Sequence, residues 1–169
     1  MITIWMTGLS ASGKTTIARE LQSKFSSFIW IDGDNFRKYV SNDLGFSMDD
    51  RRENLRRVAG VSQLLNEQGF SVITSFISPI DDIREYVRTH LNSLIVYVKA
   101  PLNVCIERDP KGLYKKALSG EIKEFTGLTS VFQEPKNPDV VVETDKQSVK
   151  ECVQCIIKAL NQKNLTSSS

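Results

Sequence analysis

Histidine, cysteine and tryptophan are scarce in this sequence of 169 residues, which contains one histidine, three cysteines and two tryptophans. Because His90 is the only histidine, Cys152 and Cys155 have no second pair of ligands, which argues against the usual four-ligand zinc site. An odd number of cysteines without regular spacing also argues against a disulfide framework and favours a reducing, cytoplasmic compartment. Cys152 shares a helical spacing with apolar neighbours, so we expect it in the core.

Long hydrophobic runs and an excess of one charge are also absent. No run reaches the ~18 apolar residues that a membrane helix requires, and residues 1–7 lack the charged flank of a signal peptide. The sequence has 22 basic and 20 acidic residues, so it has no general affinity for polyanions. We therefore expect neither a membrane nor a nucleic acid as a partner.

Apolar segments that fit strands alternate along the chain with segments that fit helices. Strands are expected at residues 2–7, 28–31, 70–76, 94–98 and 140–142. Helices are expected at residues 14–24, 34–41, 49–68 and 81–91, from Pro101 onward and after residue 142. The alternation predicts an α/β fold of three layers, in which helices cover both faces of a central parallel sheet of about five strands. The length fits a single domain at residues 1–162, followed by a flexible tail at residues 163–169.

A complete G-x-x-x-x-G-K-[ST] motif, Gly-Leu-Ser-Ala-Ser-Gly-Lys-Thr, follows the first predicted strand and precedes a helix. Its glycines let backbone N–H groups turn toward phosphate oxygens, and the helix N-terminus attracts the same charge. Lys14 is expected at the β- and γ-phosphates and the Thr15 hydroxyl at Mg²⁺. The motif predicts a P-loop NTPase or nucleotide-kinase fold. The predicted ATP site consists of Gly8, Leu9, Ser10, Ala11, Ser12, Gly13, Lys14, Thr15, Thr16 and Arg108.

Residues 109–138 are polar, rich in lysine, glycine and proline, and too long for an ordinary connection. Arg108 and Lys111 lie at the start of this segment, and Lys115 comes soon after them. Phosphoryl transfer depends on positioning and charge neutralisation, so we interpret the segment as a mobile cationic lid that closes over ATP. Together with a chain too short for a switch or motor apparatus, the lid favours a small kinase.

Polar residues after the second strand and on the long helix predict a site for the molecule that receives the phosphate. Asp34 lies at the strand end where open α/β sheets bind ligands, and it could accept a hydroxyl proton or order Mg²⁺ through water. Asp32 fits either a similar role or that of a helix cap. Arg51 and Asn54 lie three residues apart on one helix face, and with Arg37 they are expected to hold an anionic acceptor.

Several runs of sequence form a combination that extends beyond the P-loop. They are residues 8–16, 32–37, 43–46, 50–57, 73–79, 108–116, 120–123 and 125–127. The P-loop is generic, whereas the Asp-Gly-Asp-Asn, Ile-Ser-Pro and Lys-Gly-Leu-Tyr runs are specific in combination. Together the runs resemble the adenylyl-sulfate kinases, and the resemblance extends from about residue 2 to residue 145.

The resemblance implies that ATP phosphorylates the 3′-hydroxyl of adenylyl sulfate in sulfate assimilation, with Mg²⁺ as cofactor and a homodimer as the working unit. It places Lys14 at the phosphates of ATP and Asp34 near the 3′-hydroxyl of the acceptor. It also marks Ser78 as a phosphoserine, although an in-line transfer needs no covalent step. The acceptor site that it implies, with the two phenylalanines on either side of the adenine, consists of Asp34, Arg37, Phe46, Arg51, Asn54, Ile77, Ser78, Lys111, Leu113 and Phe132.

The sequence also departs from the family pattern. Ile80 and Asp81 follow the Ile-Ser-Pro run where the family usually has an aromatic and a basic residue, and Gln133 replaces a usual glutamate. A change of charge near an anionic acceptor can change which acceptor is bound. Two alternatives therefore stay open: a kinase of the same fold acting on the ribose hydroxyl of another nucleotide, and a non-catalytic regulatory domain that binds nucleotide. The complete set of P-loop and carboxylate residues disfavours the second.

Overall fold

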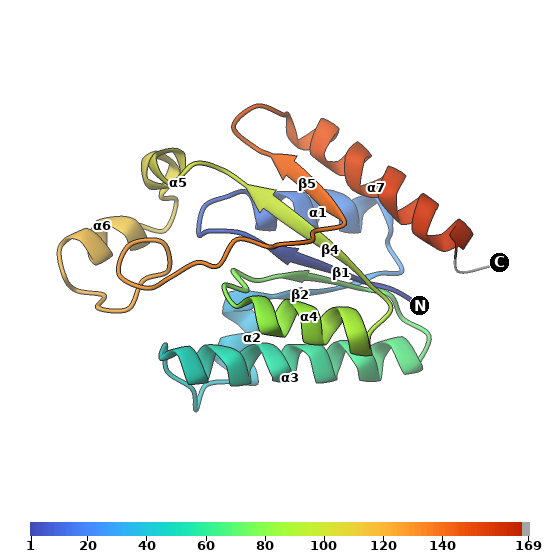
Figure 1. Cartoon of the computed structure of the whole chain (residues 1–169), viewed down its shortest axis with the longest axis horizontal. Helices are drawn as coiled ribbons and strands as arrows, with labels where there is room; N and C mark the ends of the chain where they lie inside the picture. The colour runs from blue at the N-terminus through green and yellow to red at the C-terminus, as the bar shows by residue number, and fades with distance from the viewer. Residues whose placement is uncertain (167–169) are drawn as a thin grey trace.

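The computed structural model describes residues 1–166, which contain one sheet of five parallel strands in the order β2-β3-β1-β4-β5 (Figure 1). The strands are β1 (Thr3–Thr7), β2 (Ile29–Asp32), β3 (Val72–Ser75), β4 (Ser93–Lys99) and β5 (Val140–Glu143). The helices are α1 (Lys14–Lys24), α2 (Gly33–Tyr39), α3 (Met48–Glu67), α4 (Asp81–His90), α5 (Leu102–Arg108), α6 (Leu113–Leu118) and α7 (Val149–Thr166). The predicted three-layer α/β fold is confirmed.

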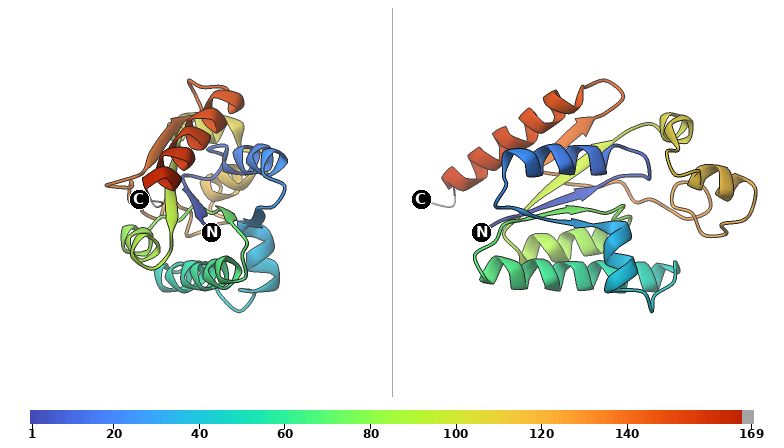
Figure 2. Two further views of the ribbon diagram at one scale, coloured as in Figure 1. Left: turned by 90° about the vertical axis from the view of Figure 1, so that its right-hand side faces the viewer. Right: turned by 180° about the vertical axis from the view of Figure 1, so that it is seen from behind.

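Two apolar cores lie on opposite faces of the sheet, because successive side chains of a strand point in opposite directions. Ile4 and Met6 of β1 pack with side chains of α1 and α7, including the buried Cys152, whereas Trp5 packs with α3 and α4. Figure 2 shows the two pairs of helices on the two sides of the sheet. The middle strands are buried almost throughout, as their near-continuous apolar sequences predict for parallel strands that are covered on both faces.

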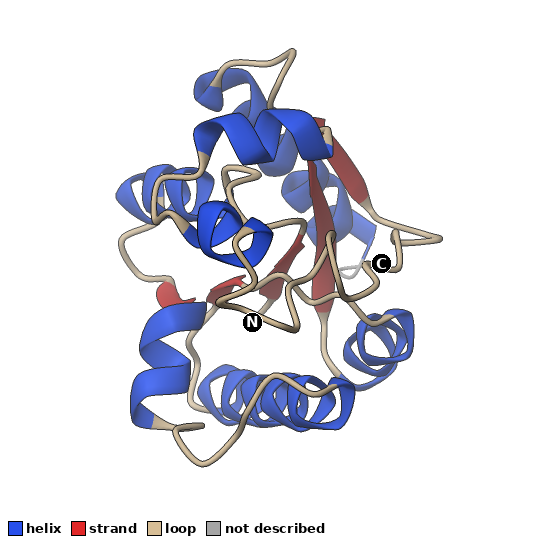
Figure 3. Cartoon of the chain, turned by 90° about the vertical axis from the view of Figure 1, so that its left-hand side faces the viewer, coloured by secondary structure: helices blue, strands red, loops and turns tan. Residues whose placement is uncertain are grey.

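The carboxyl ends of all five strands meet at one edge of the sheet, because every pairing is parallel. The P-loop, the start of α2, the loop at residues 77–79 and α5 all begin at this edge, which faces the viewer in Figure 3. Segments that are distant in the sequence thus converge where open α/β sheets bind ligands.

The segment predicted to be a lid, residues 109–138, is partly helical and packs on the P-loop. It contains α6, and the fully buried Tyr114 and the buried Phe125 belong to a third apolar cluster that also includes P-loop side chains. The six residues of this short helix show little helical periodicity in their sequence. It begins after Gly112 with φ of 64°, and the Asp109 carboxylate accepts the N–H groups of Tyr114 and Lys115 at 3.0 Å each.

The predicted tail is partly helical. Helix α7 continues through Thr166, so residues 163–166 extend an amphipathic helix whose inner face packs on the sheet. Residues 167–169 of that predicted tail lie outside the described residues.

Candidate active site

A cleft of about 920 Å³ lies at the carboxyl edge of the sheet. Its walls come from the P-loop, the start of α2, one face of α3, the loop after β3 and the lid. It brings together most of the residues that the sequence singles out, namely Ser10, Ala11, Gly13, Lys14, Thr15, Thr16, Asp34, Arg37, Phe46, Arg51, Asn54, Ile77, Ser78, Arg108, Lys111 and Leu113.

The P-loop needs glycine where the chain turns and where it approaches β4. Gly13 has φ of 105° just before α1 begins. A Cβ atom on Gly8 would lie 2.2 Å from the carbonyl oxygen of Val98, closer than any side chain allows. Larger residues at these two positions would push the loop away from the sheet that supports it.

The Lys14 ammonium lies inside the P-loop. It donates to the carbonyl oxygens of Gly8 at 2.9 Å and Leu9 at 2.6 Å, and to the Ser12 hydroxyl at 3.4 Å. Burial lowers the pKa of Lys14 to about 8, and nearby negative charge, including Asp34, only partly offsets this. An anion that reached the loop would favour the charged ammonium again.

The two aspartates at the end of β2 have different roles. Asp32 is the N-cap of α2, because its Oδ1 accepts the N–H groups of Asp34 at 3.1 Å and Asn35 at 3.3 Å. Asp34 lies in the first turn, and its exposed carboxylate forms an ion pair with Lys111 of the lid. Of the two, Asp34 therefore has the carboxylate that accepts no backbone N–H from the residues the structure describes, and it can accept a proton within the cleft.

Arg108, the last residue of α5, contacts the P-loop through a residue that sequence reasoning missed. Its guanidinium donates to the hydroxyl of Thr144 at 2.9 Å and to the carbonyl oxygen of Thr144 at 2.8 Å. The same hydroxyl donates to the carbonyl oxygen of Ser12 at 2.7 Å. Thr144 directly follows β5, so the strand-end argument that found Asp34 could have found it too.

Arg51 joins α3 to the lid and to the loop before α3. Its guanidinium donates to the carbonyl oxygens of Phe46 at 2.7 Å and Glu124 at 2.8 Å, and to the hydroxyl of Thr126. Burial lowers the pKa of Arg51, as it does that of Arg37, but both guanidinium groups stay charged at neutral pH. Two cations thus line this end of the cleft.

The same end of the cleft has an open aromatic face and an unsatisfied amide. Arg37 lies over the Phe46 ring, with its Cζ atom 4.5 Å from the ring centroid, yet Phe46 is still 56% exposed. Asn54 is buried, and its Oδ1 atom has no hydrogen-bond partner among the described residues. A buried acceptor of this kind is costly unless a ligand or water meets it.

Ser78 and Phe132 make contacts other than those expected. The buried Ser78 hydroxyl accepts the indole N–H of Trp5 at 3.0 Å, which leaves it poorly placed to act as a nucleophile. Phe132 packs on Tyr97, with ring centroids 6.0 Å apart, and lies outside the cleft wall as the structure describes it. The predicted roles of both residues stay predictions.

The residues that depart from the family pattern lie away from the cleft. Ile80 is buried in the core between the sheet and α3 and α4. Asp81 and Gln133 border a second pocket of about 480 Å³, next to α4. The acidic residue at position 81 therefore leaves the charge of the cleft wall unchanged.

The comparison with known proteins decides the family. The family model described as adenylylsulphate kinase matches residues 1–143. The chain belongs to the adenylyl-sulfate kinase family. The adenylyl-sulfate kinase of Clostridium kluyveri is 47% identical over 168 residues, which cover 96% of this chain and 84% of that protein. That of Bacillus pumilus is 48% identical over 167 residues, which cover 95% of this chain and 85% of that protein.

Solved structures agree with this assignment. The APS kinase CysC of Mycobacterium tuberculosis, solved in complex with AMPPNP and APS, is 42% identical, with a TM-score of 0.90 over 94% of this chain and 96% of that one. A sugar kinase from Janibacter sp., 20% identical with a TM-score of 0.68, shares the fold alone. As a member of the adenylyl-sulfate kinase family, this chain is an enzyme that transfers phosphate. Within residues 1–166, no helix has both the length and the apolar character needed to cross a membrane.

Proposed function

We propose that this chain transfers the γ-phosphoryl group of ATP to the 3′-hydroxyl of adenylyl sulfate, giving ADP and 3′-phosphoadenylyl sulfate, as in sulfate assimilation. The observation that carries the proposal is the composition of one cleft. It contains a P-loop for a triphosphate, an exposed carboxylate, and a second wall with two arginines, an exposed aromatic ring and an unsatisfied amide oxygen. The relatives named adenylyl-sulfate kinase and the neighbour solved with AMPPNP and APS support the same pair of substrates.

On the donor side, Lys14 would exchange the carbonyl oxygens of its own loop for the β- and γ-phosphate oxygens of ATP. The backbone N–H groups of the P-loop and the N-terminus of α1 would bind the same phosphates. Arg108, held by Thr144, would add a positive charge beside the nucleotide.

The donor set fits Mg²⁺. The Thr15 hydroxyl is exposed in the cleft wall, and the carboxylates of Asp32 and Asp34 border the same cleft. Mg²⁺ usually takes one or two protein oxygens together with phosphates and water, so it does not require the cluster of three metal-binding side chains that the described residues lack. Thr15 would hold the ion directly and Asp34 through water. When bound, the ion neutralises charge on the phosphates.

In the transfer step, Asp34 would accept the proton of the 3′-hydroxyl while the hydroxyl oxygen bonds to the γ-phosphorus. The bond between that phosphorus and the β–γ bridging oxygen breaks, and ADP leaves with the electron pair. Lys111, which pairs with Asp34, would then stabilise the negative charge on the transferring group. This in-line step requires no covalent bond to Ser78.

On the acceptor side, Arg37 and Arg51 would bind the phosphosulfate by forked hydrogen bonds, and Asn54 would meet a donor of the acceptor with its free oxygen. Phe46 would stack on the adenine, and Phe132 would reach the other face by turning from Tyr97. Ile77, Ser78 and Leu113 would line the pocket.

We further propose that the enzyme works as a homodimer in the cytoplasm. The family resemblance implies the dimer, and ATP as donor fits the location. Light scattering of the purified chain at micromolar concentration tests the first proposal: twice the mass of one chain supports it, and the mass of a single chain contradicts it.

An acceptor panel tests the proposed reaction. ADP release would be measured with adenylyl sulfate, AMP, adenosine and guanine nucleotides, and the phosphorylated product would be identified by mass. We expect turnover with adenylyl sulfate and a loss of two powers of ten or more in Lys14→Ala, because one preorganised charge at the transition state contributes ~3 kcal/mol or more. Turnover with another nucleotide but none with adenylyl sulfate would reject the proposal.

A further inference from the structure

Gln133 lies near the end of the lid, in the segment that returns to the sheet. Its hydrogen bonds connect this returning segment to the start of α4. Its backbone N–H donates to the carbonyl oxygen of Pro79 at 2.9 Å, and its side-chain Oε1 accepts the N–H of Asp81 at 2.8 Å. Its carbonyl oxygen accepts from Arg84. Ile80, the N-cap of α4, has no side chain that can accept a hydrogen bond, so Gln133 supplies an acceptor that the first turn of the helix needs.

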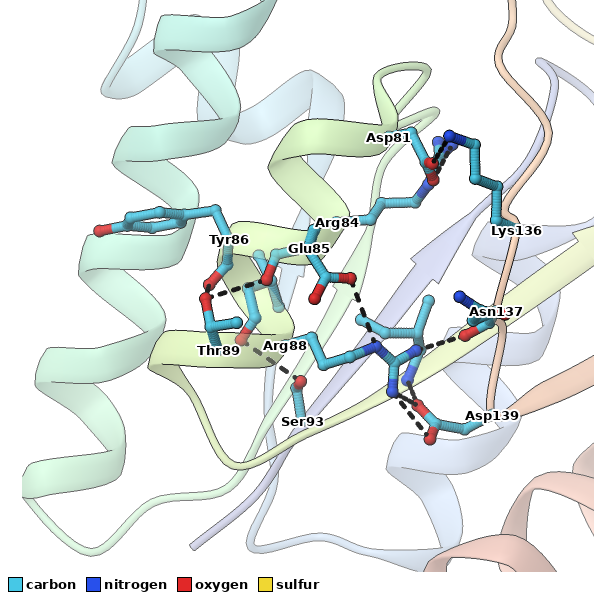
Figure 4. A network of polar contacts seen from close by, with 12 residues as sticks. Asp81, Arg84, Glu85, Tyr86, Arg88, Thr89, Ser93, Lys136, Asn137 and Asp139 are labelled. Atoms are coloured by element: carbon cyan, nitrogen blue, oxygen red, sulfur yellow. Dashed lines mark hydrogen bonds and ion pairs between the residues drawn. The ribbon is translucent and has the colours of Figure 1, made fainter.

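Arg84 connects this returning segment to the loop after β3. It is only 3% exposed, and its two terminal nitrogens donate to the carbonyl oxygens of Ser78 and Gln133 and to the carboxylate of Asp81. Its Cζ atom also lies 5.9 Å from the centroid of the Phe132 ring. Figure 4 shows the Asp81 carboxylate where the side chains of Arg84 and Lys136 meet.

The loop that Arg84 contacts has a strained backbone. Ser78 has φ of 44°, a conformation that residues other than glycine keep only when their surroundings enforce it. The Thr7 hydroxyl donates to the carbonyl oxygens of Ile77 and Ser78 at 2.9 Å each, and the Gly8 N–H donates to that of Ile77 at 3.1 Å. These bonds come from β1 and the P-loop, and Arg84 of α4 donates a further bond to the carbonyl oxygen of Ser78.

We propose that Arg84, oriented by Asp81 and by Gln133, is a positioning residue for the acceptor. It holds the loop at residues 77–79, which lines the cleft, against the segment that carries Phe132. The inference rests on the proposed function, which defines this side of the cleft as the acceptor side. The planar fork of a guanidinium holds two carbonyl oxygens in fixed directions, whereas the rotatable ammonium of lysine does not fix the directions of its bonds.

Helix α4 also provides a matched control. Arg88 lies one turn after Arg84 and contacts the same returning segment, at the carbonyl oxygen of Asn137 and the carboxylate of Asp139, as well as Glu85 (Figure 4). In the part of the chain that the structure describes, none of these partners lines the cleft. A role in stability alone would leave the KM for the acceptor unchanged in variants of either arginine.

The test compares Arg84→Lys and Gln133→Ala with Arg88→Lys, using ATP and adenylyl sulfate in steady-state assays. We expect the KM for adenylyl sulfate to rise about tenfold in Arg84→Lys and by a smaller factor in Gln133→Ala, because a hydrogen bond to a charged group contributes more than a neutral one. The KM for ATP should stay within about twofold in all three variants, and Arg88→Lys should match the wild type. Gln133 is on the surface, so we expect Gln133→Ala to fold. If Arg84→Lys fails to fold, Gln133→Ala alone tests the inference.

Tryptophan emission gives a readout that needs no substrate. In a Trp30→Phe background, the emission reports on Trp5, which donates to the Ser78 hydroxyl. It should shift in Arg84→Lys and Gln133→Ala and stay unchanged in Arg88→Lys. An unchanged acceptor KM and emission in the first two variants, or equal changes in Arg88→Lys, would overturn the inference. Whatever the variants show, the proposed function stands if the wild type phosphorylates adenylyl sulfate. If the wild type does not, the proposed function fails, and the tryptophan emission alone tests whether Arg84 positions the loop.

Discussion

At the scale of residues, Asn54 lies in the cleft at a cost to stability that its proposed role in acceptor binding would explain. Its amide is buried on α3, and its Oδ1 atom has no partner among the described residues. Burying such an acceptor costs ~1–3 kcal/mol, which evolution tolerates where a ligand supplies the missing donor. Stability and acceptor binding should therefore respond in opposite directions to a change at this position.

Substituting Asn54→Leu tests this. Leucine has a similar volume and no polar atoms, so we expect the free energy of unfolding to rise by ~1 kcal/mol. The KM for adenylyl sulfate should rise about tenfold or more, with the KM for ATP unchanged. Urea unfolding and steady-state kinetics provide the two measurements. Acceptor kinetics equal to the wild type would remove Asn54 from the acceptor site.

At the scale of elements, helix α6 shows how the lid is coupled to the P-loop. Tyr114 is fully buried, and its hydroxyl donates to the carbonyl oxygen of Ser10 at 3.0 Å. Its ring lies edge-on to Phe125, with centroids 4.8 Å apart. The lid therefore contacts the P-loop directly, and a change in α6 should alter the KM for ATP.

The variant Tyr114→Phe keeps the ring and removes the hydroxyl. The Ser10 carbonyl then loses its partner, which costs ~1 kcal/mol, and we expect the KM for ATP to rise about fivefold. Tyr86→Phe is the matched control, since Tyr86 is exposed and stacks on His90 on the far side of α4. Equal ATP kinetics in the two variants would contradict the coupling.

The elements also differ in how far the sequence can reveal them. β1 and α1 were predictable, because a buried parallel strand is continuously apolar and the P-loop motif lies between a strand and a helix. Helix α6 was not predictable from its sequence. The conformation of Gly112 and the contacts of Asp109 determine where it begins, whereas its own residues show little helical pattern. The contacts of Arg84 and the burial of Ser78 depend on partners 49 and 73 residues away, so no local pattern records them.

For the molecule as a whole, Lys14 makes stability depend on pH. Its pKa falls from 10.5 to about 8 in the folded state because of burial. Between these values the unfolded chain binds more protons, so this group's contribution to the free energy of unfolding rises with pH. The full effect would be about 3 kcal/mol. Tyr97 and Tyr114 act in the opposite direction above about pH 10, because burial raises their pKa and the unfolded chain loses those protons first.

Comparison with Lys14→Met isolates this effect. We expect the variant to be more stable than the wild type below pH 8, by up to about 3 kcal/mol, because it buries no charge. The difference should shrink steadily between pH 8 and pH 10. Urea unfolding of both proteins at pH 7, 8, 9 and 10 measures it, and a difference that is independent of pH would contradict the lowered pKa.

The order of the strands has a consequence for synthesis. β1 lies in the middle of the sheet, yet its neighbours β3 and β4 begin only at Val72 and Ser93. At the usual speed of translation, the ribosome takes roughly ten seconds to deliver both after the first strand has emerged. Until β3 emerges, the nascent chain exposes β1 with both hydrogen-bonding edges open, and one edge stays open until β4 follows. The second edge of β1 finds its partner only when β4 has emerged as far as residue 99.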